Sequence, residues 1–334
     1  MKLVAVLTAA AALAGSTVTV HAETLRFSSF EPPVAFITSQ ILTPWAADVS
    51  AASNGALDIE IFAGGSLGRD PAQQLALVEN GVADIAWIVP GYTPGRFAQA
   101  TVAELPFLVQ TATAGSRAMW EMYESGQFAG DFENFKMLGI FATAPNFIGA
   151  NVPVRVPSDA AGLNFRAPGP TLLSAIEAIG AVPVGGITGP TVAESVNRGL
   201  IAGTLTNWNA AETFRMEDVL TQYNTVPLGA TPLLVVMNRA RYDSLPEEAR
   251  AAIDEFSGAA LSERFGAAFD ENNANGRERM LATGTMEVID PDEALAAQWR
   301  EAVAVATSDW IANNENGQVL YDAFVAALGR AENQ

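Results

Sequence analysis

The sequence predicts an α/β protein made of two similar lobes. Segments with strand character alternate with segments with helix character, which is typical of sheets whose strands run mainly parallel. The sequence Asn-Gly-Val-Ala at 80–83 is echoed by Arg-Gly-Leu-Ile at 198–201, so the order helix, glycine, strand occurs in both halves. The chain has 334 residues, of which 49% are hydrophobic, enough for a large core. No low-complexity linker divides the halves, so we expect the chain to cross between the lobes more than once.

In the first half, strands and helices follow one another from residue 24 onwards. Apolar patterning predicts strands, and we expect them at 24–27, 57–62 and 82–89. Helices are expected between them, at 35–51 and 71–80. The second helix has a clear start, because Asp70 is a good cap, Pro71 suits the first helical position and Gln73 completes a capping box.

The second half follows the same order. We expect strands at 163–167 and 200–205 and, between them, helices at 171–179 and 190–198. Two further helix starts follow: Ser-Leu-Pro-Glu at 244–247 opens a run that extends towards residue 282, and Asp-Pro-Asp-Glu at 290–293 opens another helix. Ligands in such folds bind beyond the carboxyl ends of the strands. The candidate site loops are therefore 28–33, 87–92, 144–147, 166–169 and 206–209.

The first 22 residues have the features of a secretory signal peptide. Lys2 precedes an apolar run over 3–13, and small residues lead to Ala22, after which we expect cleavage. The run is too short to span a bilayer, and no later run reaches the ~18 residues that a membrane helix needs. An uncleaved membrane anchor is the alternative. We therefore expect a mature protein that is soluble outside the cytoplasmic membrane.

The composition excludes several kinds of chemistry. Cysteine is absent, and the single histidine, His21, lies in the predicted signal peptide. The mature chain then offers no disulfide, thiolate, imidazole base, or zinc site made of Cys or His. The formal charge of −19, from 18 basic and 37 acidic residues, argues against nucleic acid as a partner, because phosphate binding needs clustered cations. We expect no cofactor and no metal site.

A series of short motifs follows in a fixed order along the mature chain. They are Leu-Gly-Arg-Asp at 67–70, Val-Glu-Asn-Gly-Val-Ala-Asp-Ile-Ala at 78–86, Leu-Pro-Phe-Leu at 105–108, Gly-Leu-Asn-Phe-Arg-Ala-Pro-Gly at 162–169, Ile-Gly-Ala-Val-Pro-Val at 179–184, the segment 194–203, and Tyr-Asp-Ser-Leu-Pro at 242–246. Through these motifs, the chain from residue 24 to about residue 281 resembles the extracytoplasmic solute receptors of TRAP transporters, of the dicarboxylate-receptor type. TRAP transporters are tripartite ATP-independent periplasmic importers.

The resemblance implies a two-lobed periplasmic binding protein with a ligand cleft between the lobes, crossing strands and a long connecting helix. By analogy, lobe I contains residues 23–143 plus 232–271, and lobe II contains residues 144–231 plus 272–334. Such a receptor closes on a small organic acid in the periplasm and delivers it to membrane permease subunits. We expect it to be a monomer.

Two other classes of function remain open from the sequence. A secreted hydrolase could use one carboxyl group as proton donor and another as base or nucleophile, but no nucleophile elbow, metal motif or spaced pair of acids is recognisable. A structural or adhesive envelope protein is the third class, and the regular α/β alternation argues against it. We therefore expect a binding protein with no catalytic residues, and not an enzyme.

Arg166 is the leading candidate for ligand binding. It ends a predicted strand between apolar neighbours, and a buried guanidinium needs a partner because an unpaired buried charge is costly. Its rigid fork matches a carboxylate in a bidentate pair. From the residues alone, an internal acid could equally be that partner, whereas the resemblance implies a carboxylate anchor, the role of the family's matching arginine. Pro168 and Gly169 would let the loop turn sharply beside a ligand.

The loop before Asn-Val-Pro at 151–153 departs from the family pattern. Many members have a second arginine there, whereas this sequence has Ala-Pro-Asn-Phe at 144–147. An amide, Asn146, and an aromatic ring, Phe147, replace the second cation. We therefore expect a monocarboxylate with an apolar or aromatic body to fit better than a dicarboxylate or a sugar acid.

Five further residues in the candidate loops could line the cleft. Asn207 and Trp208 follow a predicted strand and offer an amide and a flat apolar surface with one donor. Trp87 lies near the end of another strand, and Phe30 and Glu31 lie in the first loop. For each tryptophan, ordinary packing in the core is the alternative.

Overall fold

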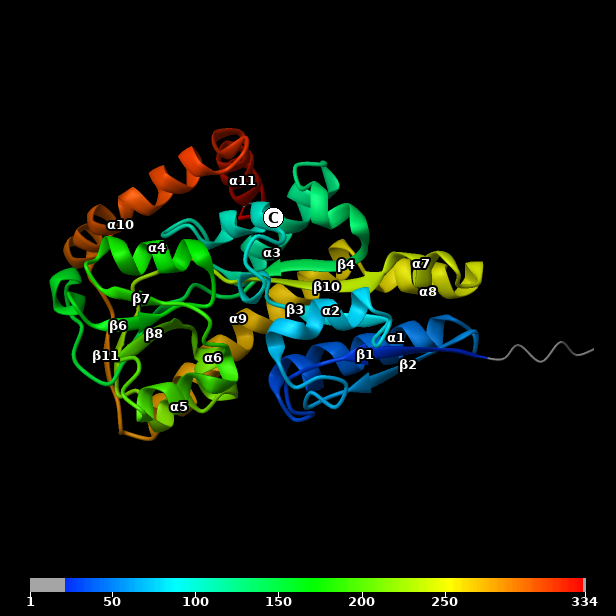
Figure 1. The fold of residues 1–334 in the computed structure, drawn as a ribbon, viewed down its shortest axis with the longest axis horizontal. Helices are drawn as coiled ribbons and strands as arrows, with labels where there is room; N and C mark the ends of the chain where they lie inside the picture. The colour runs from blue at the N-terminus through cyan, green and yellow to red at the C-terminus, as the bar shows by residue number, and fades with distance from the viewer. Residues whose placement is uncertain (1–21, 333–334) are drawn as a thin grey trace, which may run out of the picture.

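The chain forms two lobes, each built on one β-sheet (Figure 1). The structure is a computed structural model that describes residues 22–332, so the predicted signal peptide lies outside the described residues except for Ala22. The first sheet has five strands in the order β2-β1-β3-β10-β4, and the second has six in the order β11-β9-β5-β8-β6-β7. This arrangement confirms the predicted α/β class.

Both sheets are mixed, with parallel pairs and with antiparallel pairs at the strands next to the crossings. Strand β1 pairs in parallel with β2 and β3, as β6 does with β7 and β8. The antiparallel pairs involve β10 and β5. The strands of the first sheet are β1 Glu23–Ser28, β2 Leu57–Phe62, β3 Ile85–Ile88, β4 Phe135–Ala142 and β10 Pro232–Asn238. Those of the second are β5 Phe147–Ala150, β6 Asn164–Arg166, β7 Val182–Val184, β8 Gly203–Thr206, β9 Gln222–Asn224 and β11 Glu287–Ile289.

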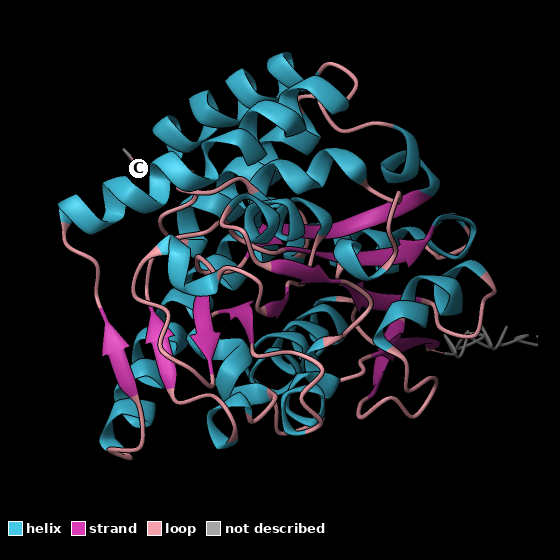
Figure 2. Ribbon diagram, turned by 60° about the vertical axis from the view of Figure 1, so that its left-hand side comes forward, coloured by secondary structure: helices cyan, strands magenta, loops and turns pink. Residues whose placement is uncertain are grey.

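Helices pack around both sheets (Figure 2). The α-helices are α1 Thr43–Ala52, α2 Gln74–Glu79, α3 Ala112–Glu124, α4 Pro170–Ala178, α5 Val192–Asn197, α6 Trp208–Thr213, α7 Arg239–Asp243, α8 Glu247–Phe256, α9 Ala259–Ala282, α10 Glu293–Asn313 and α11 Gly317–Ala331. Short 3₁₀ segments include Pro90–Tyr92 and Ala98–Glu104. Over residues 22–332, no helix has both the length and the apolar character to cross a bilayer.

The first sheet is buried on both faces, because neighbouring residues of a strand point to opposite sides. In β3, Ala86 and Ile88 join the core formed with α2, α3 and α11, whereas Ile85 and Trp87 join the core formed with α1, α8 and α9. A strand covered on both faces is apolar throughout, which explains the continuous apolar run that predicted this strand.

Two chain segments cross between the lobes side by side, one between β4 and β5 and the other between β9 and β10. The Thr143 amide donates to the Thr231 carbonyl (3.0 Å), and the Asn146 amide donates to the Gly229 carbonyl (2.7 Å). These bonds join the two crossings into one short ribbon between the sheets.

Helix α9 is the long connecting helix, and it runs between the lobes (Figure 1). The Asp270 carboxylate accepts hydrogen bonds from the backbone amides of Ala112 (2.7 Å) and Thr113 (2.9 Å), at the start of α3. Less than one turn later, Asn273 Oδ1 accepts from the amide of Trp208 (3.0 Å), at the start of α6. One turn of α9 is therefore fastened to both lobes.

Two predicted helices differ from the observed ones. The run expected from 244–247 towards residue 282 is divided into α8 and α9, and α9 follows Gly258, whose φ is +70°. The Gly258 amide donates to the Leu138 carbonyl of β4 (2.7 Å), so a tertiary contact sets this break. The helix expected at 35–51 begins as a π-helix, Ile37–Leu42.

The C-terminal helices are shared between the lobes. Trp299 and Val303 of α10 pack in the core of the second lobe, whereas Leu320 and Phe324 of α11 pack in the core of the first. The lobe boundaries implied by the resemblance, with all of 272–334 in lobe II, remain a prediction, and α11 is the segment that lies apart from that division.

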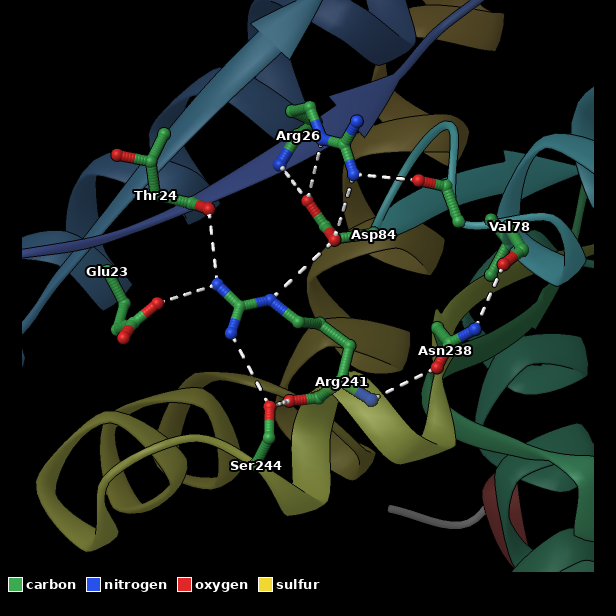
Figure 3. A network of polar contacts seen from close by, with 9 residues as sticks. Glu23, Thr24, Arg26, Val78, Asp84, Asn238, Arg241 and Ser244 are labelled. Carbon is green, nitrogen blue, oxygen red and sulfur yellow. Dashed lines mark hydrogen bonds and ion pairs between the residues drawn. The ribbon is translucent and has the colours of Figure 1, made fainter.

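A polar network ties together the amino-terminal ends of β1 and β3 and the start of α7 (Figure 3). Asp84 is 6% exposed, and its carboxylate accepts from the backbone amide (2.8 Å) and Nε (3.1 Å) of Arg26. Arg241 Nε lies 3.7 Å from the same carboxylate, and Arg241 Nη2 donates to Glu23 (2.8 Å). Asn238 caps α7 by accepting from the Arg241 amide (3.0 Å). Each charged group in this network therefore has a partner of opposite sign.

Candidate functional site

A cavity lies between the lobes, beyond the carboxyl ends of β1, β3, β6 and β8. This position agrees with the general rule for open α/β sheets. The lining is mainly aromatic and aliphatic, with a few polar side chains. Its aromatic members are Phe30, Phe36, Trp87, Tyr92, Phe214 and Phe269, and its buried polar members are Glu31, Thr143, Asn146, Arg166, Thr206, Asn207, Asn209 and Thr231.

Arg166, the last residue of β6, is 2% exposed and lines the cavity. Its Nε donates to the Ile187 carbonyl (2.8 Å), Nη1 to Thr204 Oγ1 (3.4 Å) and Nη2 to the Tyr92 hydroxyl (3.1 Å). A guanidinium has five N–H donors, so one donor on each terminal nitrogen remains for a bidentate partner.

The charge of Arg166 has no counter-ion among the residues that the structure describes, although 15 other ion pairs are present there. Burial lowers the pKa of this guanidinium, and the contact with Tyr92 acts in the opposite direction. An arginine nevertheless stays protonated in proteins. The cavity therefore holds a desolvated positive charge and two free donors, which is what a ligand carboxylate needs.

Tyr92 connects the two lobes above this charge. It ends the 3₁₀ segment after β3 in the first lobe, and its hydroxyl accepts from Arg166 Nη2 (3.1 Å) and from the Gly189 amide of the second lobe (2.8 Å). A hydroxyl has two acceptor sites and one donor. Because both acceptor sites are occupied, the hydroxyl proton is free for a ligand oxygen.

Beside Tyr92, the backbones of the two lobes approach too closely for a side chain to fit between them. A Cβ atom on Gly91 would lie 2.1 Å from the Pro168 carbonyl oxygen of the other lobe. Nearby, the Glu104 carboxylate of the first lobe accepts from the amides of Thr171 (2.9 Å) and Leu172 (3.3 Å), at the start of α4 in the second. The structure therefore shows the lobes in close contact along this edge.

The amides lining the cavity are held mainly by the protein itself. Asn146 Nδ2 donates to the Gly229 carbonyl (3.1 Å) and to Thr231 Oγ1 (3.0 Å). Asn207 caps α6 by accepting from the Ala210 amide (2.9 Å), and its Nδ2 lies 3.5 Å from Asn146 Oδ1. These two predicted residues therefore lie side by side.

Two aromatic residues predicted for the site form one wall of the cavity. The rings of Phe30 and Trp87 are stacked, with centroids 4.2 Å apart, and Trp87 Nε1 donates to Ser29 Oγ (2.9 Å). Because the indole donor is already satisfied, Trp87 offers a ligand its flat apolar face.

Glu31 follows Phe30 and is 2% exposed. Its Oε2 has no hydrogen-bond partner within the described residues. Burial raises the pKa of this carboxyl to about 8, and a hydrogen bond from the Thr38 backbone opposes that shift. The group is therefore mostly a neutral acid at pH 7.

The structure brings together seven of the nine candidate residues on the cavity wall: Phe30, Glu31, Trp87, Asn146, Arg166, Pro168 and Asn207. Phe147 and Trp208 are not part of the lining. Their rings pack against each other at 4.5 Å in the core of the second lobe, and Trp208 also packs against Tyr223 at 5.1 Å. Each starts its element with the side chain in the core and not in the cavity lining, so the core alternative stated for Trp208 describes its position, and Phe147 is likewise a core residue.

Sequence reasoning missed several lining residues. Tyr92 lies in a candidate loop, and its position after β3 could have identified it. Phe36 and Phe269 come from helices and meet edge to face at 5.3 Å. No local pattern distinguishes such residues from core aromatics, since their place depends on how α9 and the start of α1 meet.

The cavity lacks the parts of a catalytic site within the described chain. Among residues 22–332, Arg166 is the one cation in its lining, and Glu31 the one acid. No group of three acids that could hold a metal ion occurs in residues 22–332. The arrangement suits capture of a small anion with an apolar body.

Comparison with known proteins places this cavity in context. The family model described as bacterial extracellular solute-binding protein, family 7 (DctP) matches residues 27–313. A TRAP solute-binding protein of an unidentified marine microbe, specific for aromatic acid ligands and solved with 3-hydroxybenzoate, is 30% identical. Its TM-score is 0.88, over 93% of this chain and 99% of that one.

Two further relatives differ in their ligands. A TRAP solute-binding protein of Rhodoferax ferrireducens, solved with copurified benzoate, is 26% identical with a TM-score of 0.88, over 93% of this chain and 99% of that one. The C4-dicarboxylate-binding periplasmic protein DctP of Rhodobacter capsulatus is 23% identical over 75% of both chains.

Proposed function

The chain belongs to family 7 of the bacterial extracellular solute-binding proteins, and we propose that it captures an aromatic monocarboxylate in its interlobe cavity for a TRAP transporter. The family and the solved relatives are solute-binding receptors and not enzymes. The secreted hydrolase considered from the sequence is therefore set aside.

The observation that carries the proposal is a buried arginine without a counter-ion in an aromatic cavity. Arg166 would bind the ligand carboxylate through its two free donors, and the Tyr92 hydroxyl would donate a third hydrogen bond. Charge-assisted bonds of this kind are the strong ones. The rings of Phe30 and Trp87 would cover the ligand body, since stacked aromatic surfaces favour offset or edge contacts.

The same lining argues against a dicarboxylate. A second carboxylate in the cavity would find no second cation within the described residues, and an uncompensated buried charge is expensive. The solved relatives with aromatic acids are also more similar in sequence than the dicarboxylate-binding relative. Both points support a monocarboxylate, as the missing second arginine predicted.

Binding to a ligand panel tests this proposal. The mature protein, unfolded and refolded to remove any copurified ligand, would be heated with benzoate, 3-hydroxybenzoate, mandelate, succinate, malate and glucuronate. A ligand at a hundredfold excess over its Kd adds about 2.7 kcal/mol to the unfolding free energy, which raises the Tm by several degrees. We expect shifts with the aromatic monocarboxylates. Larger shifts with succinate or malate would overturn the proposal.

We also propose that the receptor works in the periplasm and delivers its ligand to membrane permease subunits. N-terminal sequencing of the secreted protein should then begin at Glu23. Uptake of the labelled ligand by cells that carry the permease subunits should require this protein, and uptake without it would contradict the role.

A further inference from the structure

Glu31 is fixed at the edge of the cavity by its own loop. The Gly64 amide donates to the Glu31 carbonyl (2.7 Å), and Pro32 and Pro33 follow. Each proline fixes its own φ angle and restricts the backbone of the residue before it. The side chain is 2% exposed and belongs to the cavity lining. The position of its carboxyl group is therefore set by the first lobe.

Glu31 and Arg166 lie on opposite lobes and do not pair. The described part of the chain places no cation within 4.0 Å of the Glu31 carboxylate, and its Oε2 has no hydrogen-bond partner. An unpaired buried polar atom is uncommon and costly. A ligand that reaches from Arg166 to Glu31 would remove this cost.

The other buried polar side chains of the lining already have partners. The Thr143, Thr206 and Asn209 side chains donate to carbonyl oxygens of the protein, and Asn146 and Asn207 are bonded as described above. A ligand in this cavity therefore meets one open polar position at the Arg166 guanidinium and the neighbouring Tyr92 hydroxyl, and another at the Glu31 carboxyl, in a lining that is otherwise mainly apolar.

We propose that Glu31 forms a hydroxyl-binding subsite, so that the preferred ligand is an aromatic monocarboxylate with a hydroxyl group at the end of its ring away from the carboxylate. This inference rests on the proposed function. A neutral carboxylic acid can donate and accept at the same time, as a phenol hydroxyl can, and the raised pKa of Glu31 keeps it in that form.

An ammonium group is a poorer occupant of this subsite. It carries three donors, and Glu31 is the one acid of the lining within the described residues. Among the other buried polar side chains of the lining, the oxygens of Thr143, Asn146, Asn207, Asn209 and Thr231 each already accept a hydrogen bond from the protein. A hydroxyl group needs a single partner, which Glu31 provides.

Calorimetric titration of the mature protein with benzoate, 3-hydroxybenzoate, 4-hydroxybenzoate and 3-(aminomethyl)benzoate tests the subsite. The better of the two hydroxybenzoates should bind about tenfold more tightly than benzoate, as expected for one buried hydrogen bond. Glu31→Leu should reduce this ratio to about one, and Glu31→Gln should retain a preference. Glu104→Gln, which alters a buried acid outside the lining, is the matched control and should leave the ratio unchanged.

The outcomes separate this inference from the proposed function. If benzoate binds but hydroxyl groups add nothing, or if Glu31→Leu keeps the full ratio, the subsite is wrong and the receptor role stands. Tighter binding of the ammonium compound would also overturn it, because Glu31 would then act as a carboxylate anion. If no aromatic acid binds the wild-type protein, the proposed function fails and the subsite fails with it. Benzoate binding by each variant shows that it is folded.

Discussion

Buried ionisable groups lie at both ends of strands β1 and β3, and the two ends differ in how these groups are partnered. At the amino ends, Asp84 lies between Arg26 and Arg241, so the buried acid has two cations (Figure 3). Beyond the carboxyl ends, Glu31 lines a cavity together with Arg166, which ends β6 in the other lobe, and neither has an oppositely charged partner within the described residues. The first arrangement stabilises the fold, whereas we propose that a ligand completes the second.

The comparison shows that burial alone does not identify a ligand-binding group. Asp84, Arg166 and Glu31 are all nearly inaccessible to solvent, so exposure does not distinguish a structural ionisable group from one in a binding site. Both the partners and the position matter: Arg166 and Glu31 lack a partner of opposite charge and line the cavity, whereas Glu104, which also has an unpartnered oxygen, lies at the contact between the lobes. Four variants test this distinction, from the largest expected effect to the smallest.

Arg166→Ala should weaken binding of the carboxylate ligand by at least about a hundredfold, because it removes a bidentate, desolvated pair. The ligand-free protein should melt no lower than wild type, since the variant also removes a buried charge without a counter-ion. Calorimetry and thermal unfolding measure the two effects. Arg166→Lys should also bind weakly because the fork is lost. Unchanged affinity in the alanine variant would exclude Arg166 from the site.

Asp84→Ala should lower stability and leave ligand affinity unchanged, the reverse of Arg166→Ala. It removes the acceptor of the Arg26 amide and leaves two arginines side by side, so we expect the free energy of unfolding to fall by about 2–3 kcal/mol. Urea denaturation measures this loss. The folded variant should bind the ligand as wild type does, because Asp84 lies at the far end of β3 from the cavity. A large change in affinity would show that the two ends are coupled.

Tyr92→Phe should lower ligand affinity by about tenfold, the effect of losing hydrogen bonds to a charged partner. The phenyl ring keeps the packing, while the links to Arg166 and Gly189 disappear. Titration with benzoate measures the effect. Tyr321→Phe, on a surface helix of the C-terminal region, is a matched control that should have no effect. Equal affinity in the Tyr92 variant would mean that the hydroxyl does not face the carboxylate.

Glu104→Gln tests a buried acid that lies outside the cavity lining. Burial raises the pKa of Glu104 to about 8, and bonds from the Leu172 and Thr171 amides oppose the shift. Between about pH 4.5 and pH 8, the unfolded chain releases this proton while the folded protein keeps it, so stability falls as pH rises. The same sign applies to Glu31. The variant should therefore lose less stability than wild type over this range.

Melting temperatures at pH 5 and pH 8 measure this effect. We expect the fall in Tm to be smaller by about 2–4 °C in Glu104→Gln. Glu301→Gln, on an exposed position of α10, is a suitable control and should follow wild type. Parallel curves for the Glu104 variant and wild type would show that the carboxyl group is ionised in the folded protein.

Strand positions could be predicted from the sequence more fully than contacts between distant segments of the chain. Local patterns located β1, β2 and β6 to within a residue or two, because alternation and turn residues act over short distances. The break at Gly258 was missed, since the carbonyl that fixes it belongs to Leu138 of another strand. Helix starts such as Asp70 were predicted for the same local reason, and Asp70 does accept from the Ala72 amide.

The site follows the same division. Arg166, Trp87 and Glu31 follow from the rule that ligands bind beyond strand ends. Phe147 and Trp208 obey the same rule in sequence, yet their side chains turn into the core, because one position along a strand or helix start decides which face a side chain takes. The Tyr92 contact to Arg166 joins residues 74 positions apart, and no local pattern contains it.

The stacked pair of Phe30 and Trp87 allows events in the cavity to be followed by tryptophan fluorescence. The protein has six tryptophans, all of them within the described residues, and Trp87 is the one in the cavity lining. Its indole is shielded from water and held by Ser29 (2.9 Å), so the arrival of an aromatic guest changes the surroundings of one known fluorophore. A change in tryptophan emission during a titration would therefore report binding without a label.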